Sequence, residues 1–194
     1  MESKIESFKC LISFLKKDML SEKRTNFIKE FIFSPVFRYT VLLRFNEYLL
    51  NTKKNFLIRG MPLFWYRRLG VRLGFSIPLN VFNYGLGIVH HGLLIVNPDA
   101  RIGKNCRIHA GVNIGGSAGF KEEGDLKKYA PVIGDNTYIG PGAKLFGPII
   151  IGNGCVIGAN AVVNKSFEVD NVTIGGIPAK IISQKGSEGL VFNI

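Results

Sequence analysis

The sequence predicts a mainly β protein, a parallel β-helix built from six-residue repeats behind a short α-helical region. Aliphatic residues recur every six positions through the second part of the chain. The first part instead carries apolar residues at spacings of three and four, together with most of the net charge. We therefore divide the 194 residues into a basic helical region over 1–73, a coil over 74–183 and a tail over 184–194.

Capping signals in the first region mark where helices begin. Ser3 and Glu6 form a capping box, and Ser34 followed by Pro35 is typical of an N-cap and a first helical turn. The expected helices cover about 5–19, about 35–51 and about 56–73.

The net charge of +11 lies mainly in this helical region, because residues 1–70 contribute +8 of it. One interpretation is a cap whose apolar faces pack on the rest of the protein or on a neighbouring subunit. Peripheral contact with an anionic membrane is an additional role, since aromatic and aliphatic residues alternate with Lys and Arg there. Nucleic acid is not an expected partner, because no recognisable binding module accompanies the charge.

Composition excludes several classes of protein. No uninterrupted apolar run approaches the ~18–20 residues of a transmembrane helix. The first ten residues carry two acids and are not typical of a signal peptide. Three cysteines without CxxC spacing favour reduced thiols over a disulfide framework. We expect a cytoplasmic protein that could lie peripherally on the inner face of the membrane.

The six-residue series is the strongest signal in the sequence, and glycine follows most of its members. Three hexads would close one triangular coil, with the aliphatic side chains inside and coils stacked ~4.8 Å apart. Glycine would relieve crowding at each step. A β-sandwich is excluded because its strands alternate with period two. The series comprises Val96, Ile102, Ile108, Ile114, Ile133, Ile139, Leu145, Ile151, Ile157, Val163 and Val169.

The series breaks between Ile114 and Ile133. The intervening segment, 115–131, is charged and contains glycine, which predicts a loop that leaves the coil and could carry function. The charged residues within 121–128 are expected to form a solvated face.

The repeat resembles that of the hexapeptide-repeat acyltransferases from about residue 74 to 183. The resemblance is nearest to the branch of serine acetyltransferases and of capsule and surface-polysaccharide O-acetyltransferases. It rests on the segments Gly87–His90, Ile102–Gly103, Gly111–Gly116, Ala130–Asp135, Ile139–Lys144 and Gly176–Lys180.

The resemblance implies a left-handed β-helix, a homotrimer, and acetyl-CoA bound as co-substrate between adjacent subunits. His90 matches the family's catalytic histidine. Cofactor contacts are implied for the backbone of Gly116, Ala143 and Ala161, and for the basic side chains of Lys165 and Lys180 near the adenosine-phosphate end. No metal is expected.

Two departures bear on the acceptor. Val89 stands where serine acetyltransferases have an aspartate, and Ala130, beside Tyr129, stands near their second histidine. Both groups help to hold an amino acid in those enzymes. We therefore expect transfer of acetyl to a sugar hydroxyl in capsule or other surface-polysaccharide synthesis, with a lipid-linked or polymeric saccharide as acceptor. The alternatives are a serine O-acetyltransferase and a non-catalytic scaffold.

A histidine is suited to take the proton from an attacking hydroxyl. Strict six-residue register counted back from Val96 would point His90 into the coil and His91 outward, whereas the resemblance favours His90. His90 is the expected base and His91 the second choice. His109 follows His91 by eighteen residues, which predicts that these two stack on one corner. His109 and Tyr129 are candidates to line the acceptor site.

A zinc site of the γ-carbonic anhydrase kind is a further possibility for the histidines. Zinc needs about three ligands around an open position. The adjacent His90 and His91 could hardly both bind one ion, so this alternative is set aside.

Overall fold

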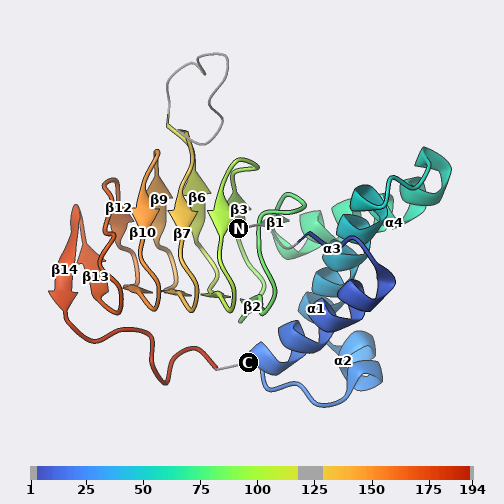
Figure 1. Cartoon of the computed structure of the whole chain (residues 1–194), viewed down its shortest axis with the longest axis horizontal. Helices are drawn as coiled ribbons and strands as arrows, with labels where there is room; N and C mark the ends of the chain where they lie inside the picture. The colour runs from blue at the N-terminus through green and yellow to red at the C-terminus, as the bar shows by residue number, and fades with distance from the viewer. Residues whose placement is uncertain (1–3, 118–128, 193–194) are drawn as a thin grey trace.

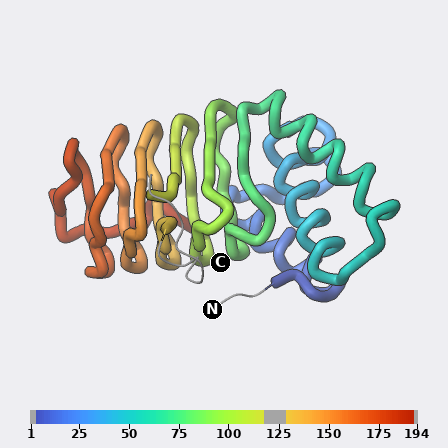
Figure 2. Tube along the Cα trace, turned by 90° about the horizontal axis from the view of Figure 1, so that it is seen from above, coloured from blue at the N-terminus to red at the C-terminus, as the bar shows by residue number. Residues whose placement is uncertain are grey.

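The computed structural model describes residues 4–117 and 129–192. It has two parts, a group of helices at one end and a stack of rungs at the other (Figure 1). Seen from above, the rungs follow one another along a single axis and the helices continue the row (Figure 2). A mainly β fold with an α-helical N-terminal cap is thus confirmed.

The helices are α1 (Phe8–Ser21), α2 (Phe27–Phe33), α3 (Pro35–Asn51) and α4 (Phe56–Leu73). The expected N-cap of α3 is present, since the Ser34 side chain accepts from the Phe37 amide at 3.2 Å. The expected capping box of α1 is wrong. Its N-cap is Ser7, which accepts from the Cys10 amide at 3.1 Å, while Ser3 lies outside the described residues. Helix α2 was not predicted from the sequence.

The strands are short, as flat faces of a triangular coil require. In the described residues they form three sheets, with orders β1-β3-β6-β9-β12, β10-β7-β4 and β14-β13-β11-β8-β5-β2. Neighbours are parallel except β13 and β14, which pair antiparallel. The bounds are β1 (Phe75–Ser76), β2 (Gly87–Ile88), β3 (Leu94–Val96), β4 (Arg101–Ile102), β5 (Arg107–Ile108), β6 (Asn113–Gly115), β7 (Val132–Ile133), β8 (Tyr138–Ile139), β9 (Lys144–Phe146), β10 (Ile150–Ile151), β11 (Val156–Ile157), β12 (Val162–Val163), β13 (Thr173–Gly176) and β14 (Ala179–Ser183).

The hexad aliphatics form three buried columns, one behind each sheet, which confirms the repeat as the source of the core. Each column places residues of successive coils in direct register. The columns are Val96, Ile114, Leu145 and Val163; then Phe82, Ile102, Ile133, Ile151 and Phe167; then Ile88, Ile108, Ile139, Ile157 and Ile174.

The predicted six-residue register differs from the structure at the two ends of the series. Val169 is 57% exposed, and Phe167 takes its expected place opposite Ile151. At the other end Ile88, not His90, occupies the column, since Ile88 pairs with Ile108. The step from Ile88 to Val96 therefore holds two residues more than a hexad. These extra residues widen the corner and turn His90 outward.

The glycines after the aliphatics are required by the spacing of the coils. A Cβ on Gly134 would lie 2.7 Å from the backbone of Gly152, and one on Gly140 would lie 2.8 Å from the carbonyl oxygen of Ile157. Real side chains do not approach a backbone so closely, so close stacking admits only glycine at these positions.

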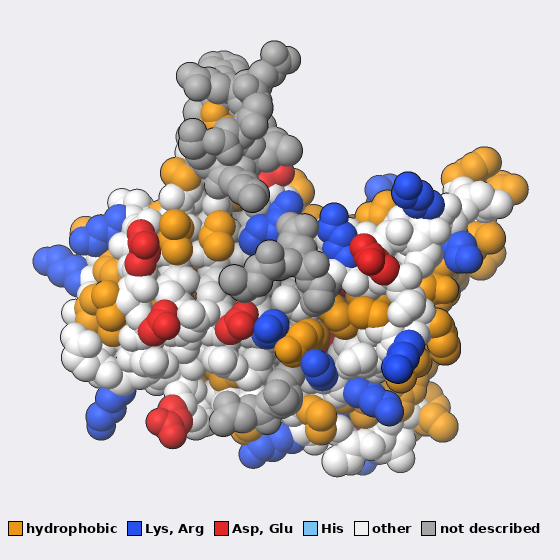
Figure 3. Space-filling view, in the orientation of Figure 1, with side chains coloured by type: hydrophobic (Ala, Val, Ile, Leu, Met, Phe, Trp, Pro, Cys, Tyr) orange, Lys and Arg blue, Asp and Glu red, His pale blue; other side chains and the backbone are white. Residues whose placement is uncertain are grey.

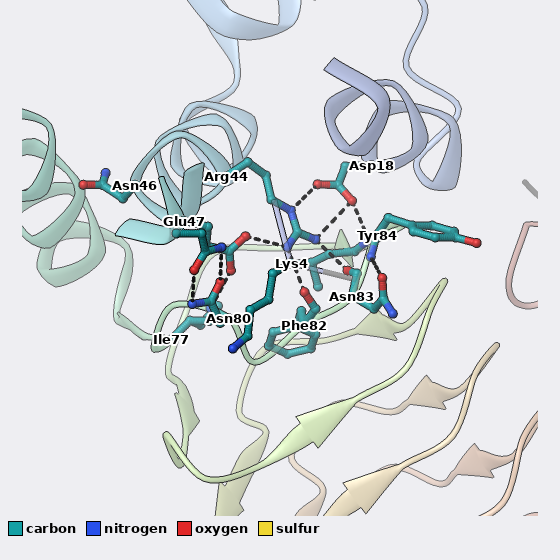
Figure 4. Close-up of polar contacts among 12 residues, drawn as sticks. Lys4, Asp18, Arg44, Asn46, Glu47, Ile77, Asn80, Phe82, Asn83 and Tyr84 are labelled. Atoms are coloured by element: carbon teal, nitrogen blue, oxygen red, sulfur yellow. Dashed lines mark hydrogen bonds and ion pairs between the residues drawn. The ribbon is translucent and has the colours of Figure 1, made fainter. Parts of the chain in front are cut away.

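A buried polar network joins the helices to the first coil (Figure 4). Arg44 of α3 is fully buried and donates from Nε to Asp18 of α1 at 2.7 Å and from Nη1 to Glu47 at 2.9 Å. It also donates to the carbonyl oxygens of Phe82 and Asn83, at 2.8 and 2.7 Å. Burial alone would lower the pKa of Arg44, but the carboxylates of Asp18 and Glu47 raise it, so the guanidinium stays charged.

Asp18 completes this junction on the coil side. Its Oδ1 accepts from the amides of Gly85 and Leu86, at 2.7 and 2.9 Å. One carboxylate thus joins α1, α3 and the turn before β2. The first coil, which carries His90 and His91, is therefore held in a fixed place against the helices.

The predicted excursion over 115–131 falls largely outside the described residues, which omit 118–128 and with them the expected solvated face. At its base the Ser117 amide donates to the Tyr129 carbonyl at 2.8 Å. Beyond β14 the tail runs back under the coil toward the helices (Figure 1). There the Phe192 ring lies between Lys23 Nζ, at 4.1 Å, and the Arg107 guanidinium, at 5.3 Å. Among the described helices, none is long and apolar enough to cross a membrane.

Candidate active site

The widened corner after β2 brings two of the three histidines together. The His90 and His109 rings lie with centroids 6.4 Å apart and planes at 65°. The Val89 amide donates to the Ile108 carbonyl at 3.1 Å, and this bond holds the two corners side by side. The expected stack of His109 on His91 is wrong, because this coil contains twenty residues between paired positions, not eighteen.

His90 and His91 are both exposed, whereas His109 is half-buried. Burial lowers the pKa of His109, and the nearby Arg107 and His90 lower it further. His109 is therefore neutral at pH 7. Its Nε2 is buried without a hydrogen-bond partner in the described part of the chain. A neutral His109 adds no positive charge beside an exposed His90 that accepts a proton.

Tyr138 lies beside His109 and was not predicted, and Arg107 is its neighbour in the sheet. The Tyr138 ring centroid lies 4.9 Å from that of His109, and Arg107 pairs with Tyr138 in the sheet register. Arg107 directly precedes Ile108, and Tyr138 directly precedes Ile139; both isoleucines belong to a buried column. In a strand the residue next to an inward position faces outward, so this pattern could have placed them beside the histidines.

Gly116 and Tyr129 lie together at the base of the excursion. A Cβ on Gly116 would be 2.8 Å from the Tyr129 carbonyl oxygen and 3.0 Å from the side-chain nitrogen of Asn97. Only glycine allows this approach. The position is suited to a backbone contact with a ligand, and Tyr129 is half-buried beside it.

Ala143 and Ala161 have fully buried side chains, so a ligand could contact only their backbones. Their carbonyls already accept from the amides of Asn113, at 3.0 Å, and Lys144, at 2.8 Å. Their own amides donate at 3.3 and 3.2 Å within tight turns. These amides are the weaker-bonded groups and the ones a ligand could contact.

Lys165 and Lys180 are both exposed. Lys165 Nζ lies 5.4 Å from the centroid of the Phe167 ring. Neither lysine forms a salt bridge with the described residues, so both are available to an anionic ligand. Within residues 4–117 and 129–192, no group of three or more His, Cys, Asp or Glu side chains is placed to hold a metal ion.

The profile of the bacterial transferase hexapeptide family (six repeats) matches residues 130–165, which form the regular coils from β7 to β12. Residues 130–165 thus match the repeat of the hexapeptide-repeat transferases, the family that the sequence resembles. Their left-handed β-helix is the fold seen here, which confirms the expected fold class.

Serine acetyltransferases are among the proteins similar to this chain. That of Staphylococcus xylosus is 41% identical over 99 residues, which are 50% of this chain and 43% of the relative. The crystal structure of serine acetyltransferase from Neisseria gonorrhoeae is 28% identical and has a TM-score of 0.66. The match covers 96% of this chain and 70% of that one. Serine acetyltransferase from Brucella abortus strain S19, solved in complex with coenzyme A, is 26% identical with a TM-score of 0.68, over 91% and 67% of the two chains.

These relatives correct the expected acceptor. Transfer to a sugar hydroxyl in surface-polysaccharide synthesis is wrong, because the similar curated proteins and solved structures are serine acetyltransferases. The apolar side chains of Val89 and Ala130 do not by themselves determine the acceptor. The chain spans less than half the length of the curated relatives that it matches.

Proposed function

We propose that this chain is a serine O-acetyltransferase, which moves the acetyl group of acetyl-CoA to the hydroxyl of L-serine. The similarity to serine acetyltransferases over half of the chain carries the proposal. The exposed His90 beside the neutral His109 gives the acid–base group that the reaction requires.

In the proposed reaction His90 accepts the serine hydroxyl proton while the oxygen attacks the thioester carbonyl carbon. The tetrahedral intermediate then collapses: its C–S bond breaks, and the CoA sulfur leaves and takes the proton from His90. No covalent enzyme intermediate is needed, because both substrates are bound together and the site mainly aligns them. A neutral His109 leaves the pair with a single positive charge during the transfer.

Acetyl-CoA would extend along the coil from this corner, past the backbone of Gly116 and the amides of Ala143 and Ala161. Lys165 and Lys180, both exposed, would lie near its phosphates, where cations favour an anionic ligand. As part of the same proposal the coils assemble as a homotrimer, with the cofactor between neighbouring subunits, and residues 1–73 serve as its cap.

The acceptor pocket would differ from that of other serine acetyltransferases. Ala130 is buried and Val89 is half-buried. Because both side chains are apolar, neither position offers a charged group to the amino or carboxyl group of serine. A hydrogen bond to a charged group contributes about 1.5–3 kcal/mol. We therefore expect a KM for serine raised about tenfold or more for each missing group, with turnover less affected.

The test is release of CoA from acetyl-CoA with a panel of L-serine, D-serine, L-threonine and L-homoserine, with O-acetylserine identified by mass. L-Serine is expected to give the highest kcat/KM. The proposal would be overturned if CoA release at saturating L-serine and acetyl-CoA were no faster than hydrolysis of acetyl-CoA without an acceptor. We also propose peripheral membrane contact through the helical end, which is independent of this activity.

A further inference from the structure

The helical end exposes large apolar side chains that nothing in the described part of the chain covers. The start of α4 carries Phe56, Leu57 and Met61, which are 78%, 72% and 72% exposed. Single exposed apolar residues are ordinary on protein surfaces, but a cluster of this kind marks an interaction site. Further exposed members on α2 and α4 are Phe27, Ile28, Phe31, Ile32, Phe33, Ile58, Phe64, Trp65 and Val71.

The members on α2 and α4 share one surface. Phe31 of α2 and Trp65 of α4 line a single hollow of about 330 Å³ between α2, α3 and α4. Its other lining residues include three arginines, Arg38, Arg68 and Arg72. Figure 3 shows hydrophobic side chains along the outer edge of the helical end, with Lys and Arg beside them. We call this surface the outer face.

The charge of the outer face has one sign. Helix α4 contains four arginines and no acid. The acid of α2, Glu30, is already paired with Arg24. Lys53 and Lys54 are exposed just before α4 begins. The outer face therefore combines exposed apolar side chains with uncompensated positive charge. This combination matches a lipid bilayer, which has an apolar acyl interior and anionic headgroups.

The start of α4 also has the shape of an inserting tip. It is the part of the described chain furthest from the coil in both views (Figures 1 and 2). Phe56, Leu57 and Ile58 are consecutive and all exposed, so they point in directions about 100° apart around the helix. A groove on a protein partner would cover one such direction, whereas lipid can surround all of them.

We propose that the outer face docks on an anionic lipid bilayer, with the start of α4 inserted among the lipids. Phe56, Leu57 and Met61 enter the acyl boundary. Arg59, Arg68 and Arg72 contact the lipid phosphates. The coil, at the other end of the molecule, then stands away from the membrane with its histidine corner free.

The sole tryptophan of the chain, Trp65, lies on the outer face and is half-exposed, so it serves as a built-in probe. The full chain is mixed with vesicles of phosphatidylcholine containing about 30% phosphatidylglycerol, at about 0.1 M salt. The emission of Trp65 is expected to shift to the blue. Brominated acyl chains are expected to quench it, and the protein to float with the vesicles. Pure phosphatidylcholine vesicles should bind at least tenfold more weakly, because the arginines then lack anionic partners.

Two variants separate insertion from charge. F56S/L57S/M61S should abolish quenching by brominated lipid. R68Q/R72Q should weaken flotation with anionic vesicles about fivefold for each arginine. V169S is the matched control, an exposed apolar residue on the coil, and should behave as wild type. Circular dichroism checks that each variant is folded.

Three outcomes would overturn the proposal. One is an unchanged Trp65 emission with anionic vesicles. Another is equal binding by F56S/L57S/M61S and V169S. The third is a lipid-free assembly, seen by sedimentation, in which a second copy already buries Trp65 and vesicles no longer bind. None of these readouts requires acetyl transfer, so failure of the proposed activity is a separate result.

Discussion

The imidazole rings of His90 and His109 lie 6.4 Å apart, one coil from each other, with His109 the more buried of the two. The pair exists because the coil that carries His90 is two residues longer than three hexads. Those residues turn the His90 corner out toward that of His109. The pair is the centre of the proposed site. The pKa of His109 is lowered, mainly by burial.

Burial, Arg107 and His90 lower the pKa of His109 from its ordinary value of 6.5, so the folded state binds this proton less readily than the unfolded state. The neutral form therefore contributes stability above pH 6.5 that is lost as the pH falls through the folded pKa. We expect the melting temperature of wild type to drop more steeply below pH 6.5 than that of H109Q. Parallel pH profiles of the two proteins would contradict this assignment.

Breaking the junction at Arg44 should be strongly destabilising. R44M would leave Asp18 and Glu47 buried without their cation, at a cost of about 3–5 kcal/mol in the free energy of unfolding by urea. R67M, at an exposed arginine of α4, is the matched control and should change that free energy by less than about 0.5 kcal/mol. Equal effects of the two variants would show that the junction contributes little.

Stacking of the coils should tolerate no methyl group at Gly134. G134A places a Cβ 2.7 Å from the backbone of Gly152, and we expect a loss of about 1–3 kcal/mol in stability. G60A is the matched substitution within α4, where the added Cβ meets nothing within 4 Å. It should stabilise by about 0.5–1 kcal/mol, because alanine favours a helix interior. The two substitutions should therefore change the free energy of unfolding in opposite directions, which paired urea titrations can measure.

The cysteines should differ in reactivity. Burial raises the pKa of Cys106 to about 12 and also raises that of Cys155, and both thiols are buried. Cys10 is partly exposed on α1. We expect a thiol reagent at pH 8 to modify one cysteine per native chain rapidly, identified as Cys10 by peptide mass, and all three after unfolding. Rapid modification of Cys155 in the native chain would show that the coil opens.

The repeat made the coil predictable, because an inward aliphatic followed by glycine is needed at each step of regular stacking. The prediction failed where regularity ends. The extra residues between Ile88 and Val96 shifted the expected position of His90, and Phe167 replaced Val169 at the last turns. A count of residues cannot detect an insertion that is compensated by a wider corner.

The site was predictable as far as the resemblance extended. His90 was named from it, and its pairing with His109 required the true register. Tyr138 was missed because an outward residue on a regular hexad carries no signal of its own. The acceptor was wrong for another reason: Val89 and Ala130 show which groups are absent, and an absence does not determine what binds instead.

The proposed function depends on His90 as the base of a serine O-acetyltransferase. The most direct measurement is the rate of CoA release with L-serine by wild type, H90A and H91A, together with calorimetric titration of each with acetyl-CoA. We predict that H90A loses about 10²–10⁴-fold in kcat, because a positioned base contributes that much. H90A should still bind acetyl-CoA as wild type does, and H91A should stay active. Wild-type turnover by H90A, or loss of turnover in H91A alone, would contradict this prediction.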